Sequence, residues 1–336
     1  IFFDTVAGYT ADSVSSMSTW GYATSIAMLI VALAAPFLGV FGDIRGMRKK
    51  LFSFFMLLGV AACAGMAFTP GMDFTSGPVA AGKVATLILV LYIVSVIGFD
   101  ASAIYYDAFL TDVTTENRMD KVSTMGYGLG YIGGSTIPLL IFLIMNLVGV
   151  PMLTCLAFVF GLTAVWWLAF SLPLLKNCEQ TSGKPYEKGD VARSIKGVGT
   201  TIKEIIANKP MLIYILSYFF YIDGVHTVIS MATTYGTNLG LDSTGMMLAL
   251  LLVQILGLPF CLLYIKCSEK FGARTMVGFG ICVYMFICIF AFFMNSLWQF
   301  WVLAVLCATS QGGIQALSRS MYGKLIPDKD RSGEFF

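Results

Sequence analysis

The sequence predicts an all-α integral membrane protein, and three observations lead to this prediction. The chain of 336 residues is 57% hydrophobic and only 12% charged, whereas a soluble domain has roughly 25% charged residues. Its apolar residues gather in long runs rich in Leu, Ile, Phe, Ala and Gly, without the alternation of a barrel strand. Most of the cations lie between these runs, and the few within them lie near the ends of the runs. Because a bilayer satisfies no backbone hydrogen bonds, the runs are expected to be helices.

Nine of the runs are long enough to cross a hydrocarbon core of about 30 Å, which takes about 20 helical residues. In chain order they are Trp20–Phe41, Leu51–Thr69, Ala85–Tyr106, Val122–Val148, Pro151–Leu175, Met211–Tyr235, Thr244–Lys266, Met276–Met294 and Trp298–Leu325. The distribution of cations supports this division, because every one of the 21 Lys and Arg except Lys83 falls on the same side. Since positive residues stay on the cytoplasmic side, the N-terminus is expected outside and the C-terminus in the cytosol.

Composition also argues against several functions. A net charge of +2 gives no reason to expect nucleic acid as a partner. His226 is the single histidine of the sequence, so a multi-histidine metal site is excluded and no metal or cofactor is expected. Catalysis inside a membrane would need a nucleophile with a base, or metal ligands, at one depth. The scattered cysteines and one histidine do not supply these, so the protein is not expected to be an enzyme.

The longest interval between runs predicts the domain organisation. We expect an N-terminal helix bundle over residues 1–175, a cytosolic linker over residues 176–210 and a C-terminal helix bundle over residues 211–336. The first part of the linker is polar with Gly and Pro. Its second part predicts an amphipathic helix, because one stripe holds Val191, Ile195, Val198, Ile202, Ile205 and Ile206. This helix lies on the inner membrane surface or packs on the ends of other spans.

A short basic loop joins the first two runs and has a weaker copy later in the chain. The marked residues of the first loop are Gly39, Asp43, Gly46, Arg48 and Lys49. The corresponding residues after the seventh run are Glu269, Gly272 and Arg274. The two loops suggest an internal duplication, and internal repeats of this kind mark secondary transporters.

The pattern Gly39-x-x-x-Asp43-x-x-Gly46-x-Arg48-Lys49 resembles the loop signature of the major facilitator superfamily. That signature joins the second and third spans of a twelve-span fold. The resemblance therefore implies that nine of the twelve helices are present and that the first and the last two are missing. It also implies that Asp43 meets the N-terminus of the eleventh helix, which we expect to lie outside this chain. Arg48 and Lys49 would be basic partners of that contact.

Further stretches resemble the fungal vacuolar amino-acid effluxers linked to autophagy and their bacterial relatives. These stretches are Trp20–Ile26, Arg118–Ser123, Gly128–Gly134, Tyr221–Val225 and Gln315–Ser320. The resemblance implies a secondary active or facilitative transporter of small polar solutes, with amino acids as the expected class, working by rocker-switch alternating access. It implies a monomer in a bacterial cytoplasmic membrane, whose partners are the lipid bilayer, the solute and H⁺ or another coupling ion. Two alternatives remain: a non-transporting receptor or scaffold on the same fold, and a transporter of sugars, peptides or drugs.

In this superfamily the first helix of each three-helix repeat lines the central cavity. The runs Ala85–Tyr106, Met211–Tyr235 and Trp298–Leu325 are therefore expected to carry the polar groups that bind the solute. The candidates in these runs are Asp100, Asp223, His226, Gln311 and Gln315.

Asp223 is 12 residues past Met211, which places it about 18 Å into the span and near the midplane. An ionised carboxylate there costs several kcal/mol unless it is paired or hydrated. His226 lies three residues later on the same face of the helix. Together, Asp223 and His226 are therefore predicted to bind a proton or the ammonium group of a substrate. The alternative is that Asp223 and Gly224 open the helix and satisfy the local backbone.

The remaining candidates have two interpretations each. Asp100 and Arg319 are expected near the cytosolic ends of their runs, where they form a gate or a structural ion pair. Arg118 is a second cation for such a gate or ion pair. Gln311 and Gln315 share one face, so they line the cavity or form hydrogen bonds between helices.

Overall fold

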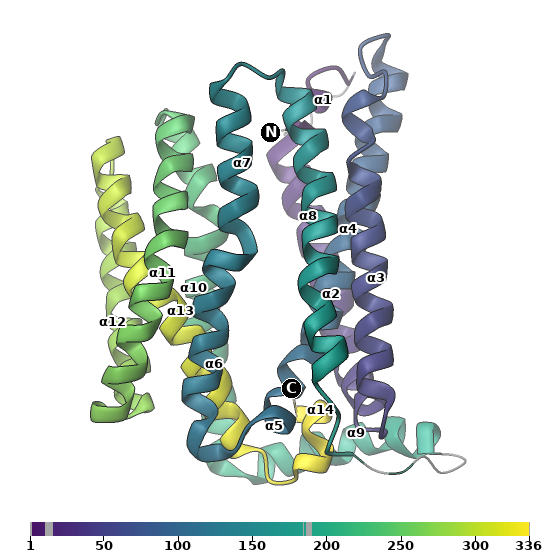
Figure 1. Cartoon of the computed structure of the whole chain (residues 1–336), viewed down its shortest axis with the longest axis vertical. Helices are drawn as coiled ribbons and strands as arrows, with labels where there is room; N and C mark the ends of the chain where they lie inside the picture. The colour runs from purple at the N-terminus through teal and green to yellow at the C-terminus, as the bar shows by residue number, and fades with distance from the viewer. Residues whose placement is uncertain (1, 11–15, 184, 186–189, 336) are drawn as a thin grey trace. The chain divides into compact units, whose positions relative to one another are not determined.

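The computed structural model describes residues 2–10, 16–183, 185 and 190–335, and most of these residues are helical. Within these ranges, nine helical segments are long and apolar enough to cross a membrane, which confirms the prediction (Figure 1). The segments are Ser18–Gly42, Met47–Gly71, Pro78–Val113, Glu116–Leu147, Met152–Asn177, Lys209–Asn238, Ser243–Phe271, Ala273–Phe292 and Leu297–Leu325.

One compact unit combines Ile1–Val113, Leu140–Gly199 and Asp328–Phe336. Its helices include α1 (Phe2–Ala7), α2 (Ser16–Gly42), α3 (Met47–Met66), α4 (Pro78–Ala108), α5 (Leu110–Val113), α8 (Met152–Asn177) and α14 (Ser332–Phe335). Helix α4 packs on α2 and α3, α3 packs on α8, and the short α14 packs on α2 and α4. The backbones of α3 and α4 approach so closely that a Cβ on Gly98 would lie 2.5 Å from the Gly59 nitrogen. Small residues permit such close helix packing.

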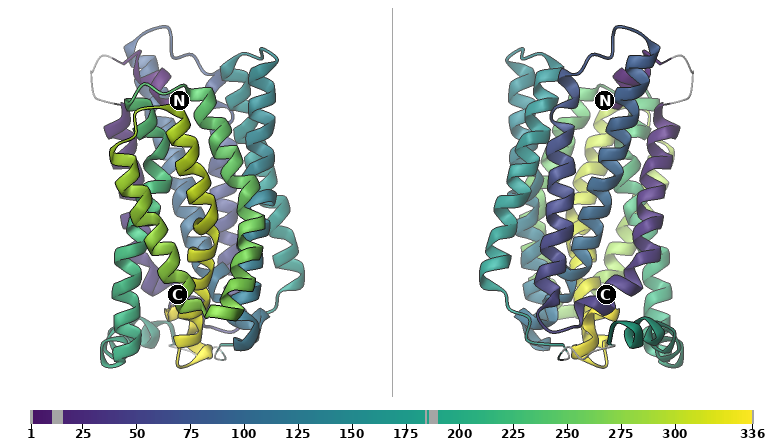
Figure 2. Two further views of the ribbon diagram at one scale, coloured as in Figure 1. Left: turned by 90° about the vertical axis from the view of Figure 1, so that its left-hand side faces the viewer. Right: turned by 90° about the vertical axis from the view of Figure 1, so that its right-hand side faces the viewer.

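The other compact unit combines Thr114–Leu139 and Thr200–Pro327. Its helices include α6 (Glu116–Gly130), α10 (Lys209–Asn238), α11 (Ser243–Phe271), α12 (Ala273–Phe292) and α13 (Leu297–Leu325). Helix α13 is central, because α6, α10, α11 and α12 all pack against it. Figure 2 shows α10 to α13 running beside one another. Their core is mainly aliphatic and aromatic, with Val225, Ala249, Ile287 and Leu317 nearly inaccessible.

Among the described residues, the membrane-length segment Glu116–Leu147 contributes to both units. Helix α6 continues through a π-helical stretch, Tyr131–Thr136, into α7 (Ile137–Leu147). The boundary between the compact units falls within α7. The two compact units therefore do not consist of the same residues as the two helix bundles expected from the sequence. The division of the chain into bundles at the long loop stays a prediction.

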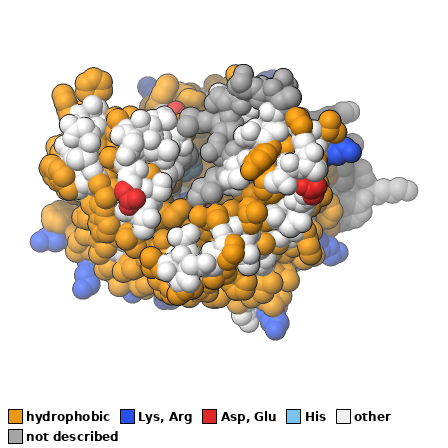
Figure 3. Space-filling model, turned by 90° about the horizontal axis from the view of Figure 1, so that it is seen from above, with side chains coloured by type: hydrophobic (Ala, Val, Ile, Leu, Met, Phe, Trp, Pro, Cys, Tyr) orange, Lys and Arg blue, Asp and Glu red, His pale blue; other side chains and the backbone are white. Residues whose placement is uncertain are grey.

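The outer surface is strongly apolar, as a bilayer-facing surface should be. Large side chains such as Phe220 and Phe292 are 74% and 80% exposed. Figure 3, which looks down on one end of the molecule, shows many hydrophobic side chains around the rim of this view. Monomeric soluble proteins rarely expose apolar patches larger than a few hundred Å², so exposure on this scale indicates lipid contact.

The long interval after α8 contains the predicted helix, α9 (Asp190–Ala207). Ile202 and Ile206 on its expected apolar stripe are exposed. The side chains of Val191 and Ile195 lie outside the part that the structure describes. Whether α9 contacts lipid or other helices therefore stays a prediction.

Candidate functional site

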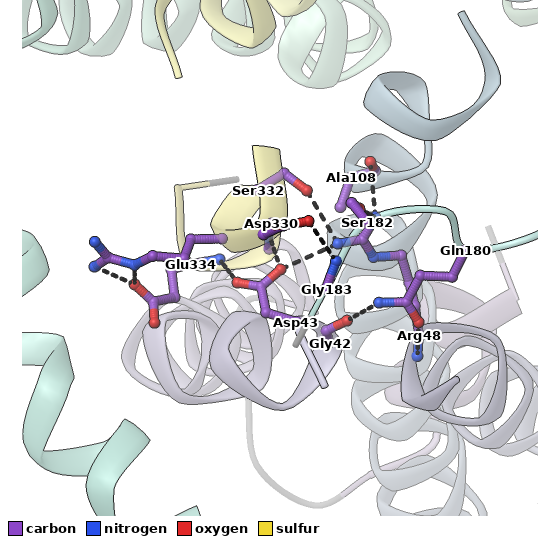
Figure 4. Close-up of polar contacts among 12 residues, drawn as sticks. Gly42, Asp43, Arg48, Ala108, Gln180, Ser182, Gly183, Asp330, Ser332 and Glu334 are labelled. Atoms are coloured by element: carbon purple, nitrogen blue, oxygen red, sulfur yellow. Dashed lines mark hydrogen bonds and ion pairs between the residues drawn. The ribbon is translucent and has the colours of Figure 1, made fainter. Parts of the chain in front are cut away.

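The loop between α2 and α3 builds a buried polar site in the first unit (Figure 4). Helix α2 ends at Gly42 and α3 begins at Met47, so the chain reverses within a few residues. Gly46 permits this turn because its φ of 80° lies in the left-handed region, which glycine adopts without steric cost. Asp43 and Arg48 flank the turn, and both side chains are buried.

The Asp43 carboxylate caps the N-terminus of α14. It accepts hydrogen bonds from the backbone N–H groups of Gly333 at 2.6 Å and Glu334 at 2.8 Å. Such first-turn N–H groups have no partner within their own helix. Burial raises the pKa of Asp43 to about 7, although these N–H groups and Arg48 act in the opposite direction. The expectation that the helix meeting Asp43 lies outside this chain is wrong, because α14 supplies the N-terminus.

Two glycines allow this contact. A Cβ on Gly39 would lie 1.9 Å from the Gly333 carbonyl oxygen, and a Cβ on Gly333 would lie 2.5 Å from the Gly39 carbonyl oxygen. Neither position has room for a side chain, so α2 and α14 approach backbone to backbone. Gly39 therefore has a steric role, since it lets the Gly333 N–H reach Asp43.

The Arg48 guanidinium lies at the centre of the site and is fully buried. Its Nη2 donates to Asp43 Oδ1 at 3.0 Å and to Ser332 Oγ at 3.0 Å. Its Nη1 donates to Asp112 Oδ2 and to the Ala108 carbonyl oxygen, the latter at 3.2 Å. A buried charge is tolerated only when it is paired and hydrogen-bonded. Arg48 therefore ties the motif loop to α14 and to the segment at the end of α4.

Asp112 belongs to this site although the sequence analysis did not single it out. Its side chain is fully buried and its Oδ1 accepts hydrogen bonds from Thr181 and Ser182. The polar segment that was expected only to link two bundles is thus also a partner of the motif. Arg48 could have indicated that a second carboxylate such as Asp112 was needed. A guanidinium offers five N–H donors, and one carboxylate cannot satisfy them all.

The weaker copy of the loop, which follows α11, shares the turn but lacks the polar network. Gly272 has a φ of 84°, close to that of the turn glycine in the first loop. Glu269 and Arg274 are exposed, and no hydrogen bond or ion pair joins them within the described residues. Lys49 of the first loop is half-buried and lies outside the network around Arg48. Whether these four residues act in conformational change stays a prediction.

Helix α10 carries the two candidates near mid-span. Asp223 lies near the middle of α10, His226 follows one turn later, and both side chains are exposed. Two tyrosines on the same helix fix it to α13. The Tyr221 and Ser318 hydroxyls share a hydrogen bond of 2.6 Å, and the Tyr214 hydroxyl donates to the Ser318 carbonyl oxygen at 2.6 Å. Asp223 and His226 therefore project from a helix held in place by two hydroxyl contacts.

Gln311 and Gln315 on α13 are half-buried in the same unit. The Gln311 side chain hydrogen-bonds the Tyr131 hydroxyl. The Tyr131 ring occupies space that two glycines leave open, because a Cβ on Gly257 or on Gly312 would lie 2.6 Å from a ring carbon. Gln311 thus makes a contact between helices, one of its two expected roles, while its contribution to a cavity stays a prediction.

The cationic candidates lie in the second unit. Arg319 Nε donates to Ser123 Oγ at 3.1 Å, and the guanidinium lies 5.0 Å from the centre of the Tyr127 ring. Arg118 is exposed in the first turn of α6. Asp100 is half-buried on α4 of the first unit. The expected pair of Asp100 with Arg319 therefore joins residues of different units and stays a prediction.

Within the described ranges, no group of three or more His, Cys, Asp or Glu residues could hold a metal ion. The eight cysteines are free thiols. Around Arg48, Nη1 and Nη2 are both engaged by internal partners, whereas the buried Nε has no hydrogen-bond partner among the described residues. The polar groups of α10 and α13, in contrast, include exposed ones that are open to a ligand.

Comparison with known proteins agrees with this arrangement. A family model described as "Vacuole effluxer Atg22 like" matches residues 5–117 and 111–336. The uncharacterized MFS-type transporter YxiO of Bacillus subtilis (strain 168) is 40% identical over 100% of this chain and 77% of its own length. Autophagy-related protein 22-1 of Penicillium rubens is 24% identical over 62% of this chain, which spans only 39% of that relative.

A solved structure supports the fold alone. The xylose transporter XylE from E. coli, in a partially occluded inward open conformation, matches with a TM-score of 0.50 at 15% identity. The match covers 93% of this chain and 79% of XylE. The predicted membrane fold and the family resemblance are therefore confirmed. The chain belongs to the Atg22-like vacuole effluxer family, within the major facilitator superfamily of multi-pass membrane transporters.

Proposed function

We propose that this protein is a secondary active or facilitative transporter of small polar solutes, with amino acids as the substrate class. The observation that carries the proposal is the buried network of Asp43, Arg48 and Asp112 around α14. Such a network suits a transporter, because alternating access requires a specific contact that forms in one state and breaks in another.

The network suits a rocker-switch cycle. Its Asp43–α14 contact is made by hydrogen bonds to a helix N-terminus, so it is directional and breaks as a unit when α14 moves. The buried Arg48 then retains Asp112 as a partner. The break therefore leaves no isolated buried cation, which keeps its free-energy cost moderate.

We place the solute site at Asp223 and His226, with Asp100, Gln311 and Gln315 as further candidates. A carboxylate near mid-span is costly unless a cation or water meets it. The ammonium group of an amino acid would supply that cation, and an imidazole three residues away could exchange a proton with the solution. H⁺ is accordingly the coupling ion that we propose.

The proposed setting is a bacterial cytoplasmic membrane, with the N-terminus of this chain outside and its C-terminus in the cytosol. The cation distribution supports this orientation, since Lys83 is the one Lys or Arg of the sequence on the opposite side. The proposed functional form is a monomer.

Reconstituted proteoliposomes test the proposal. Uptake of a radiolabelled amino-acid mixture should require the protein and should respond to an imposed pH gradient. Asp223→Asn should lower uptake at least about tenfold, because a neutral amide lacks the negative charge that strengthens the bond to an ammonium group. Asp73→Asn is the matched control, since Asp73 is an exposed loop carboxylate outside the spans.

Each other outcome has a definite meaning. Unchanged uptake in Asp223→Asn contradicts the assigned solute site. Uptake of sugars, peptides or drugs in place of amino acids supports transport but rejects the substrate class. Amino-acid binding with no uptake under any gradient supports the receptor alternative and rejects transport.

A further inference from the structure

The chain that follows α8 makes an unusually dense set of contacts with the motif loop. We call residues Gln180–Gly183 the strap. All four strap residues form hydrogen bonds with residues far away in the sequence, on the loop after α2, in α5 or near α14. A segment that only connects two bundles would need none of these bonds.

Gln180 caps helix α3 from a distance. Gly46 is the N-cap residue of α3 and has no side chain to cap the helix. Gln180 Oε1 accepts instead from the Gly46 N–H at 2.9 Å and the Arg48 N–H at 3.3 Å. Its Nε2 donates to the Gly42 carbonyl oxygen at 2.9 Å. One side-chain amide thus holds both sides of the turn that carries Asp43 and satisfies helix-end groups that would otherwise lack partners.

Thr181 and Ser182 hold the second carboxylate of the site. Asp112 Oδ1 accepts from the Thr181 N–H at 3.1 Å, the Thr181 hydroxyl at 3.0 Å, the Ser182 N–H at 2.9 Å and the Ser182 hydroxyl at 2.7 Å. Asp112 Oδ2 pairs with Arg48. The strap therefore occupies one oxygen of Asp112 and orients the other toward the guanidinium.

Gly183 connects the strap to the segment before α14. Its N–H donates to Asp330 Oδ1 at 3.0 Å. Its φ is +111°, and an added Cβ would lie 2.6 Å from the Asp43 carbonyl oxygen. Only glycine suits this conformation and this space. The strap thus contacts all three parts that Arg48 joins, namely the loop, α5 and the α14 segment.

We propose that the strap is a positioning element of the transport cycle. It stabilises the state in which Asp43 caps α14, by fixing the loop with Gln180 and Asp112 with Thr181 and Ser182. The inference rests on the proposed transport function for its role in uptake. The structural part of the inference does not depend on any substrate.

Hydrogen–deuterium exchange of the reconstituted protein tests the strap. Gln180→Met keeps the length of the side chain and removes its three hydrogen bonds. The amides of residues 328–335 should then exchange about tenfold faster or more, because the loop that carries Asp43 loosens. Glu179→Met is the control, since Glu179 is the exposed neighbour of Gln180. Faster exchange confined to residues 178–183, or equal exchange in both variants, overturns the proposal.

A second pair of variants isolates the hydroxyl contact. Thr181 is exposed, so Thr181→Val removes the hydroxyl without disturbing a core, and Thr181→Ser retains it. Thr181→Val should raise exchange at residues 328–335, whereas Thr181→Ser should match the native protein. The opposite order overturns the proposal.

Uptake of the labelled amino-acid mixture separates the two proposals. Gln180→Met should lower the maximal rate several-fold while KM stays within about twofold, because the strap touches no candidate solute residue. If KM rises and the maximal rate stays constant, the positioning role is rejected. If the native protein shows no uptake, the proposed function fails, and the exchange experiment still decides whether the strap positions α14.

Discussion

The close contact between α2 and α14 leads to a quantitative prediction for Gly39→Ala. The added Cβ would lie 1.9 Å from the Gly333 carbonyl oxygen, whereas an ordinary contact begins at 3.4 Å, so the backbones must separate by about 1.5 Å. The Gly333 N–H, now 2.6 Å from Asp43, and the Glu334 N–H, now 2.8 Å away, then move beyond hydrogen-bond range.

The expected effect follows from the two lost bonds. A hydrogen bond to a charged group contributes about 1.5–3 kcal/mol, and 1.4 kcal/mol corresponds to about a tenfold change in an equilibrium constant. At pH 8, above the pKa of about 7 for Asp43, the carboxylate is mostly ionised. The amides of Gly333 and Glu334 should therefore exchange with deuterium at least about tenfold faster in Gly39→Ala.

Gly21→Ala is the matched control. Gly21 lies on the same helix α2, and a Cβ there would meet no atom within 4 Å. This substitution should leave the exchange at α14 unchanged and should strengthen the helix slightly, since Ala exceeds Gly in helix propensity by about 1 kcal/mol. Native-like exchange of Gly333 and Glu334 in Gly39→Ala would refute the argument that glycine contact lets Asp43 hold α14.

Three further results are expected. Because burial raises the pKa of Asp43 from 3.8 to about 7, folding favours its protonated form, so the contribution of Asp43 to stability is greatest below about pH 4 and is lost as the pH rises through about 7. In a thermal-unfolding series from pH 4 to 8, Asp43→Asn should remove that decline. Asp112→Asn should destabilise the protein by about 3–5 kcal/mol in denaturant unfolding, because Arg48 loses a buried partner. Gly313→Ala should cost about 1–3 kcal/mol in the same assay, because its Cβ would lie 2.1 Å from the Tyr264 ring.

Controls keep these results interpretable. Asp73→Asn changes an exposed carboxylate and should leave the unfolding free energy nearly unchanged, in contrast to Asp112→Asn. Gly278→Ala places a Cβ where no atom lies within 4 Å, so it should not destabilise the protein as Gly313→Ala does. An equal pH slope in the native protein and in Asp43→Asn would show that another group titrates.

Most of the fold could be predicted from the sequence because it depends on local properties. The length and apolar character of a run decide whether it can span a bilayer, and neither requires knowledge of distant residues. Among the residues that the structure describes, the nine predicted runs accordingly recur as nine segments, with ends that differ by a few residues. The fourth, for example, begins at Glu116 instead of Val122. Asp43 and Arg48 were likewise marked by their spacing around a turn glycine.

The candidate site was predictable only in part, because its partners are distant in the sequence. Asp112 lies 64 residues from Arg48, and Gln180 lies 132 residues from it. Nothing in the composition around Gln180 distinguishes a capping side chain from an ordinary linker residue. The same limit applies to Gly333, whose contact with Asp43 spans 290 residues.

The sequence by itself determined the membrane setting, the helices, the turn motif and the family resemblance. These follow from hydropathy and short-range spacing, which act within one or two helical turns. Only the tertiary structure decided that α14 meets Asp43, that Asp112 shares Arg48 and that the strap completes the site. Those contacts arise because a buried guanidinium and two buried carboxylates must satisfy one another, and the packing of helices decides which polar groups are near enough to do so.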